Sequence, residues 1–209
     1  MKFPLLLLLL PTLAHAAPLC LPEATAVALA QVSTRVDALV LARELPVHAD
    51  GVDLFDLRLW LEAHKQPALV LEPQPQVLEK LAKLGLPLIL VRAEHAVALT
   101  DLRAGQVLVT DNGQAVRTSW LAALRGAKVA LVLWENSPKQ AFTPAEWRQL
   151  TRLDADFLAS GWLRRALEVP AGAGQNELAR RALLASPCYL PAQKLARQLG
   201  VPLVRCAAE

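Results

Sequence analysis

The fold is indicated most directly by the stretch PALVLEPQPQVLEKLAKLGLPLILV, residues 67–91. Its two ends, Ala68–Leu71 and Leu88–Val91, are continuous apolar runs of strand length, whereas Gln76–Leu84 between them carries a helical pattern. Gly85 follows at the position where the helix should end. A strand, a helix and a second strand in this order predict a parallel βαβ unit, because parallel neighbours need a crossover connection.

The rest of the chain extends this alternation of short apolar runs and helical segments. Further strands are expected over residues 19–21, 38–41, 107–109, 129–133 and 201–206, and helices over 23–32, 54–63, 115–124, 144–167, 177–185 and 191–199. Thr143-Pro144-Ala145-Glu146 resembles a capping box at the start of the longest helix, which we expect to break near Ser160-Gly161. The pattern predicts an α/β fold with a mainly parallel sheet and helices on both faces. It is compatible with two small lobes, residues 17–105 and 106–209.

The first sixteen residues predict an export signal. Lys2 is followed by the apolar run Leu5–Leu10 and by Ala14-His15-Ala16, which places small residues where a signal peptidase cleaves. We expect cleavage after Ala16, which leaves residues 17–209 as a periplasmic or secreted domain. A bilayer span needs about 20 apolar residues, so the mature chain is expected to contain no transmembrane segment.

Charge and cysteine content narrow the class of protein. The formal net charge is +3 and no basic block occurs, so neither nucleic acid nor an anionic membrane surface is an expected partner. An oxidising compartment lets two of the three cysteines pair. Spacing favours Cys188 with Cys206, which would stabilise the fold by about 3 kcal/mol, and pairings with Cys20 remain open.

Polar residues follow the expected strands, where ligands bind in open parallel sheets. If the strands are parallel, Glu72, Asp111 and Glu135 face one pocket and can hold a cation or orient a polar ligand, with Asn112 beside them. The alternative is that these residues only cap helices. Trp134 closes a strand and either stacks on a flat ligand or packs in the core.

No catalytic residue is assigned from the sequence. The chain contains no GxSxG, Walker or HExxH motif, and its histidines after the signal are scattered. No serine has a neighbouring base in a recognisable pattern. We therefore expect a non-catalytic protein that needs no cofactor.

The first half resembles the N-terminal lobe of the periplasmic substrate-binding proteins that serve the uptake of cobalamin, haem and iron-siderophores. The similarity is carried by residues 17–25, 35–40, 53–63 and 77–91, which resemble that family's first two strands, a helix and a helix-Gly-x-Pro-strand unit. The resemblance implies that a ligand lies against the loops after the strands, at Pro22, Glu23, Glu44, Pro46, His48, Glu72 and Gln74.

The resulting functional prediction is an exported solute-binding protein that holds a small molecule or a metal chelate for an ABC-type uptake system, with a membrane permease as partner. One alternative is an exported metal-dependent hydrolase that uses Glu72, Asp111 and Glu135. The other is an envelope module that binds a partner protein through an apolar patch on the long helix 144–167.

Overall fold

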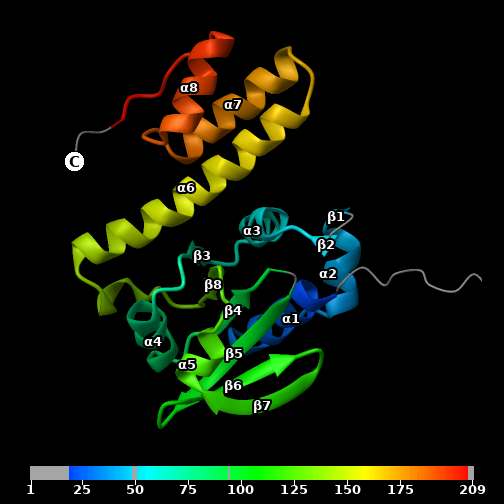
Figure 1. Ribbon diagram of the computed structural model, residues 1–209, viewed down its shortest axis with the longest axis vertical. Coiled ribbons are helices and arrows are strands. Elements are labelled where there is room, and N and C mark those ends of the chain that lie inside the picture. Colours follow the sequence, from blue (N-terminus) through cyan, green and yellow to red (C-terminus); the bar gives the residue numbers. More distant parts are fainter. Residues whose placement is uncertain (1–18, 49–50, 94, 207–209) are drawn as a thin grey trace, which may run out of the picture.

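The computed structural model describes residues 19–48, 51–93 and 95–206 (Figure 1), so the predicted signal peptide lies outside the described residues. The helices are α1 (Cys20–Gln31), α2 (Ala38–Glu44), α3 (Leu54–Ala63), α4 (Pro75–Lys83), α5 (Trp120–Leu124), α6 (Pro144–Glu168), α7 (Ala173–Ala185) and α8 (Leu190–Leu199), with the 3-10 turn η1 (Pro138–Ala141). The strands are β1 (Val47–His48), β2 (Gly51–Val52), β3 (Ala68–Leu71), β4 (Leu88–Val91), β5 (Ala96–Arg103), β6 (Gln106–Asp111), β7 (Gln114–Ser119) and β8 (Val129–Leu133).

The main sheet has six strands in the order β3-β8-β4-β5-β6-β7, and every neighbouring pair is antiparallel. The prediction of a mainly parallel sheet is therefore wrong. The unit β3-α4-β4 does form over residues 67–91, and its two strands run the same way. However, β8 enters between them from later in the chain and runs opposite to both. A short βαβ pattern does not reveal such an insertion, because the inserted strand is distant in sequence.

The segment after β4 was also misassigned. Residues 96–119 form a meander of β5, β6 and β7, where the sequence analysis expected one strand followed by a helix. Asn112 and Gly113 both have positive φ, 46° and 75°, and close the β6–β7 hairpin. This Asn-Gly pair is a strong hairpin signal. It outweighs the helical propensity of the residues that follow.

Three shorter expectations also fail. Residues 38–41 form helix α2, which begins where the Asp37 carboxylate accepts a hydrogen bond from the Leu39 N–H at 2.7 Å. Short apolar runs do not distinguish a buried strand from a helix, and the capping aspartate decides in favour of the helix. Of residues 19–21, Leu19 precedes α1 and the other two belong to it, so no strand forms there, and 201–206 have no regular structure.

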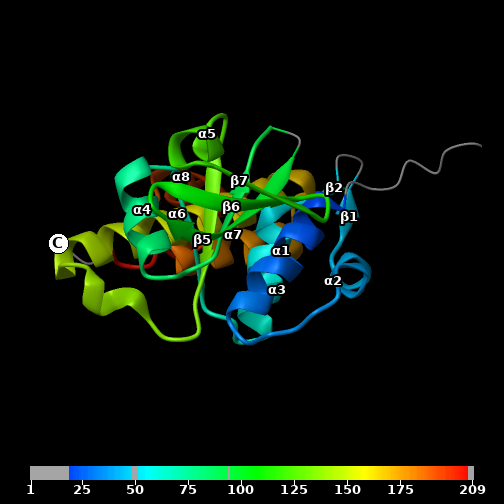
Figure 2. The same ribbon diagram turned by 90° about the horizontal axis from the view of Figure 1, so that it is seen from below.

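Helices cover both faces of the sheet, and α1 runs along one of them (Figures 1 and 2). Alternate residues of the central strands point to opposite faces. Val70, Ile89 and Leu131 pack with α1, α2 and α3, whereas Leu90 and Val132 pack with α4, α5 and the start of α6. Two apolar cores therefore lie on opposite sides of one sheet.

Helix α6 joins this sheet domain to a C-terminal helical unit, which we define as the second half of α6 with α7 and α8. The capping box is present: Thr143 Oγ1 accepts from the Glu146 N–H at 3.2 Å, and Glu146 accepts from the Thr143 N–H at 2.7 Å. The hydrogen bond from the Thr143 N–H to the Glu146 carboxylate lowers the pKa of Glu146. Figure 1 shows α7 and α8 packed on the part of α6 farthest from the sheet, where Ala166, Ala182 and neighbouring residues form a third core.

The expected break at Ser160-Gly161 does not occur, and α6 continues through it. Gly161 serves close packing instead. A Cβ atom added at Gly161 would lie 2.1 Å from the Phe55 ring, which is itself fully buried. The absence of a side chain at Gly161 therefore allows α6 to approach α3.

We expect Gly161→Ala to destabilise the protein by about 1–3 kcal/mol, because Phe55 is packed in the core and cannot move aside freely. In an unpacked helix the same change would be stabilising by about 1 kcal/mol. Urea unfolding measures the difference. A matched Gly174→Ala change in α7, where nothing lies within 4 Å of the added Cβ, is the control. Equal stability of the two variants would contradict this packing role.

The C-terminal segment is tied to the helical unit by a disulfide between Cys188 and Cys206, with a Cα–Cα distance of 5.1 Å, and Cys20 is a free thiol. We expect reduction to lower the free energy of unfolding by about 3 kcal/mol, because the bond closes a loop of 18 residues. Denaturation with and without a phosphine reductant checks this value. A Cys20→Ser background keeps the free thiol from contributing, and an unchanged midpoint after reduction would contradict the prediction.

Candidate active site

Cys20 is the first residue of helix α1. The segment that follows is rich in alanine, the best helix former, so the helix begins as soon as the chain reaches Cys20. Leu19 precedes the helix and provides no side-chain cap. The N–H groups of a first turn have no partners within the helix and interact favourably with negative charge. A thiolate is the nucleophilic form of cysteine, so this place suits a reactive thiol.

His95 and Asp111 form a hydrogen-bonded pair, with 2.6 Å between His95 Nε2 and Asp111 Oδ1. His95 directly precedes β5, and Asp111 is the last residue of β6. Because β5 and β6 are antiparallel neighbours, these two ends meet at the same edge of the sheet. The His95 carbonyl also accepts from the Arg92 N–H at 2.7 Å, which fixes the turn before β5. With Nε2 held by Asp111, Nδ1 is the ring nitrogen left for a neighbouring thiol.

Cys20 and His95 line the same cavity, whose volume is about 470 Å³; we call it the Cys20 cavity. Packing of α1 on the sheet explains why they meet. Leu21 and Ala24 of α1 share one core with Ala96 of β5, so the first turn of the helix lies beside the start of the strand. A thiol and an imidazole therefore line one cavity, and the imidazole is hydrogen-bonded to a carboxylate.

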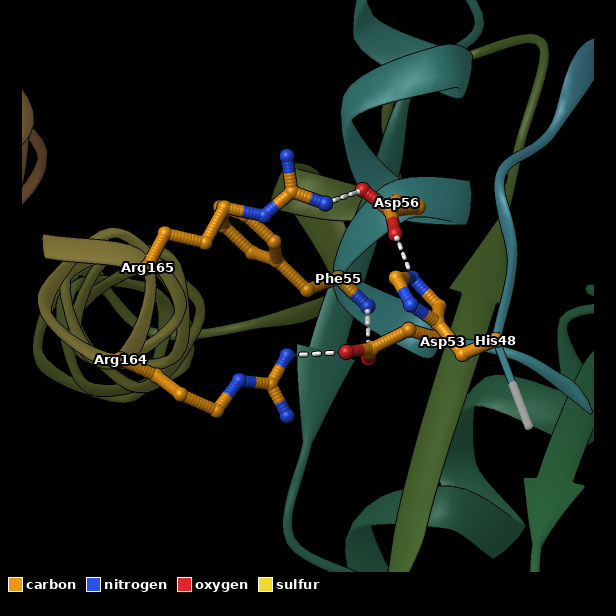
Figure 3. A network of polar contacts seen from close by, with 6 residues as sticks. All are labelled: His48, Asp53, Phe55, Asp56, Arg164 and Arg165. Atoms are coloured by element: carbon orange, nitrogen blue, oxygen red, sulfur yellow. Dashed lines mark hydrogen bonds and ion pairs between the residues drawn. The ribbon is translucent and has the colours of Figure 1, made fainter. Parts of the chain in front are cut away.

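Residues of β1, α3 and α6 form another wall of the Cys20 cavity, and Figure 3 shows the polar contacts that join them. Asp56 is buried and accepts from Arg165 of α6, and its other oxygen lies 2.9 Å from His48 Nε2. Arg164 bonds to Asp53, which also caps α3 by accepting from the Phe55 N–H at 2.9 Å. Both arginines therefore have a carboxylate partner, and the wall is fixed to the sheet domain.

The residues predicted to bind a ligand do not form one site. Glu44 accepts from Trp60 Nε1 at 2.8 Å, and Trp134 is buried with its ring 6.1 Å from that of Trp147. The remaining predicted residues are placed as follows: Glu23 lies on α1, His48 lines the Cys20 cavity, Glu72 and Gln74 line a separate pocket beside α4, Asn112 lies in the β6–β7 turn, and Glu135 accepts from Ser33 Oγ at 3.5 Å.

The carboxylates proposed for a metal-dependent hydrolase are also separated. Glu72 follows β3 and Glu135 follows β8, and these strands are antiparallel, so the two residues lie at opposite ends of the pair. Within residues 19–48, 51–93 and 95–206 no three histidine, cysteine or acidic side chains are grouped as metal ligands. In the same described part of the chain, no helix combines the length and apolarity needed to cross a bilayer.

Cys20 and His95 were not predicted as site residues. The sequence left Cys20 open as a disulfide partner and placed it in an expected strand, residues 19–21, so its position at the start of a helix was not predicted. A cysteine at a helix start, with a histidine and an aspartate farther along the chain, is a signal for a nucleophile. The contact between His95 and Asp111 depends on the antiparallel pairing of β5 and β6, which was not predicted.

Comparisons with known proteins give matches among solved structures. The chain is similar to the crystal structure of a double glycine motif protease from an AMS/PCAT transporter in complex with the leader peptide, with a TM-score of 0.47 and 20% identity. The match covers 59% of this chain and 90% of that chain. No family model matches the chain, and no curated protein matches it.

The resemblance to periplasmic substrate-binding proteins is wrong, and so is the solute-binding function predicted from it. The physical reason lies in the sheet: the resemblance assumed parallel strands whose carboxyl ends meet at one edge, whereas neighbouring strands here run in opposite directions. The loops after them therefore divide between two edges, and the expected single binding crevice is not formed.

Proposed function

We propose that this protein is a cysteine hydrolase that cleaves peptide bonds, with Cys20 as nucleophile, His95 as general base and acid, and Asp111 as the group that orients His95. The observation that carries the proposal is that Cys20, at a helix N-terminus, lines one cavity together with His95, whose Nε2 is held at 2.6 Å by Asp111. A nucleophile, a base and a group that orients the base are the parts that covalent acyl transfer requires.

The reaction follows from these roles. The Cys20 sulfur, after giving its proton to His95, attacks the carbonyl carbon of the substrate, and the N–H groups at the start of α1 favour the negative charge that develops on the oxygen. Imidazolium His95 then protonates the leaving amine as the C–N bond breaks, which leaves an acyl group on sulfur. Water attacks this thioester with His95 as base, releasing the acid and the free thiol.

The second half of the proposal concerns the place of action. The signal predicted over residues 1–16 would export the enzyme, and the Cys188–Cys206 disulfide supports an oxidising compartment such as the periplasm or the cell exterior. A free Cys20 beside a stable disulfide then calls for assays in the presence of a mild thiol reductant.

The test is hydrolysis of a mixed peptide library by the purified protein, followed by mass spectrometry, before and after alkylation with iodoacetamide. Because the other two cysteines are paired, the reagent labels Cys20 alone. We expect new peptide termini with the free thiol and none after labelling. Cleavage that survives complete labelling of Cys20, or no cleavage by the unlabelled protein, would refute the proposed function.

A further inference from the structure

The Cys20 cavity has an apolar floor beside the nucleophile. Four partly buried side chains, Val52, Val91, Val129 and Phe157, line the cavity and pack against the core beneath α1. They come from β2, β4, β8 and α6, so the floor is assembled from both the sheet domain and the C-terminal helical unit. Apolar surface of this kind gains free energy when a ligand removes it from water.

The charged groups around the apolar floor carry both signs, so they do not form a binding site for a ligand of one charge. Arg164 and Arg165 are paired with Asp53 and Asp56. The other two permanently charged residues of the lining, Arg92 and Glu168, have opposite charges, and the Arg92 guanidinium donates to the Ala123 carbonyl at 3.0 Å. Recognition in this cavity therefore depends more on the apolar floor than on charge.

The position of Phe157 is fixed by several contacts between α6 and the sheet domain. Its ring packs edge-on against Phe55 with 6.5 Å between centroids. One turn before it, Asp154 holds Arg58, and one turn after it, Gly161 packs against Phe55. The ring is thus a fixed part of the cavity.

We propose that the floor binds an apolar side chain of the peptide substrate next to the scissile bond, and that Phe157 determines the preferred size of that side chain. This proposal rests on the proposed peptidase function for its substrate. It assigns the C-terminal helical unit a role in specificity, because α6 supplies the Phe157 wall.

The first experiment does not require turnover. Cys20 is alkylated with iodoacetamide or with N-benzyl-iodoacetamide, and each rate is divided by the rate of the same reagent with glutathione. An apolar floor should favour the benzyl reagent by about tenfold at Cys20, since a phenyl ring then leaves water. We expect Phe157→Ala to lower this preference at least threefold. The rate with iodoacetamide itself should stay within twofold.

A matched variant distinguishes this role from general loosening of the fold. Phe142→Ala removes another partly buried phenylalanine, which packs in the opposite core and lies outside the Cys20 cavity, so the benzyl preference should not change. Phe157→Leu, which keeps an apolar side chain, should retain most of the preference. If Phe157→Ala does not fold, the comparison of Val129→Thr with wild type replaces it, since a hydroxyl on the floor should also lower the preference.

The second experiment uses the peptide library. Leucine, valine, methionine or phenylalanine should be enriched at one position next to the cleaved bond, and Phe157→Ala should shift this preference towards larger side chains, with kcat/KM for the best wild-type peptide falling mainly through KM. Cys20-dependent cleavage without such a preference would overturn the proposal and leave the peptidase function intact. The protein could instead show a benzyl preference that depends on Phe157 and yet cleave no peptide. That result would refute the peptidase function alone. No benzyl preference in wild type would overturn the apolar floor.

Discussion

Replacement of Cys20 by alanine is expected to abolish peptide hydrolysis, with a loss of at least about 10⁴-fold in kcat. Among the described residues that line the cavity, Cys20 is the only cysteine and none is a serine, threonine or lysine. His95→Ala should lower kcat by about as much, since residues that act as a catalytic unit have effects that are not additive.

Asp111→Asn should lower kcat by about 10²–10⁴-fold, because an amide replaces the carboxylate that contacts His95 Nε2 at 2.6 Å and orients the imidazole less well. Initial rates on a peptide selected from the library measure all three.

A second histidine–aspartate pair gives this prediction its sharpest control. His48 lines the same cavity and is held by the buried Asp56 at 2.9 Å, so it is the alternative base. We expect His48→Ala to retain kcat within tenfold of wild type. His64→Ala, outside the cavity, should have no effect. Loss of activity in His48→Ala with activity retained in His95→Ala would contradict the assignment of the base.

Replacement of Asp154 by alanine is expected to be the most destabilising single change in the fold, costing about 3–5 kcal/mol. Asp154 is buried, and it accepts from Arg58 Nε at 3.1 Å, from an Arg58 terminal nitrogen at 2.9 Å and from the Val70 N–H at 2.8 Å. Val70 belongs to the edge strand β3, so Asp154 both covers the sheet edge and fixes α6 to it. Its removal would leave the buried Val70 N–H without this acceptor, and the Arg58 guanidinium would keep only the exposed Glu62 carboxylate, at 3.7 Å, as an ion-pair partner.

Thermal and urea unfolding measure the loss, which should lower Tm by roughly 10 °C. Asp154→Asn keeps the shape and one acceptor oxygen, so its cost should be intermediate. Glu79→Ala removes an ion pair with Lys83 that is mostly exposed to solvent, and it should cost under about 0.5 kcal/mol. A loss of less than 1 kcal/mol in Asp154→Ala would show that this buried contact does not fix α6 to the sheet.

Several helices could be predicted because the signals that define them are local. Asp53 precedes α3, and the helix covers residues 54–63 as expected. Thr143 and Glu146 form the predicted capping box of α6. The strands Ala68–Leu71, Leu88–Val91 and Val129–Leu133 also lie where their apolar runs placed them. Each of these elements is specified by residues within one or two turns of chain.

The relative direction of neighbouring strands could not be predicted from these local signals. Both faces of β8 are buried, so its sequence reads as a continuous apolar run whether its neighbours are parallel or antiparallel. The Asn112-Gly113 pair is a local signal that could have predicted the β6–β7 hairpin, but only Asn112 was considered, as a neighbour of the expected ligand pocket.

The sequence by itself determined the starts of α3 and α6 and the apolar strands β3, β4 and β8, because caps and burial patterns act over a few residues. Only the tertiary structure decided that β8 inserts between β3 and β4, that the ends of β5 and β6 bring His95 to Asp111, and that α6 forms the far wall beside Cys20. These features depend on contacts between residues far apart in the chain. The packing of helices on both sheet faces and the close approach of α6 to α3 at Gly161 decide how the elements are placed.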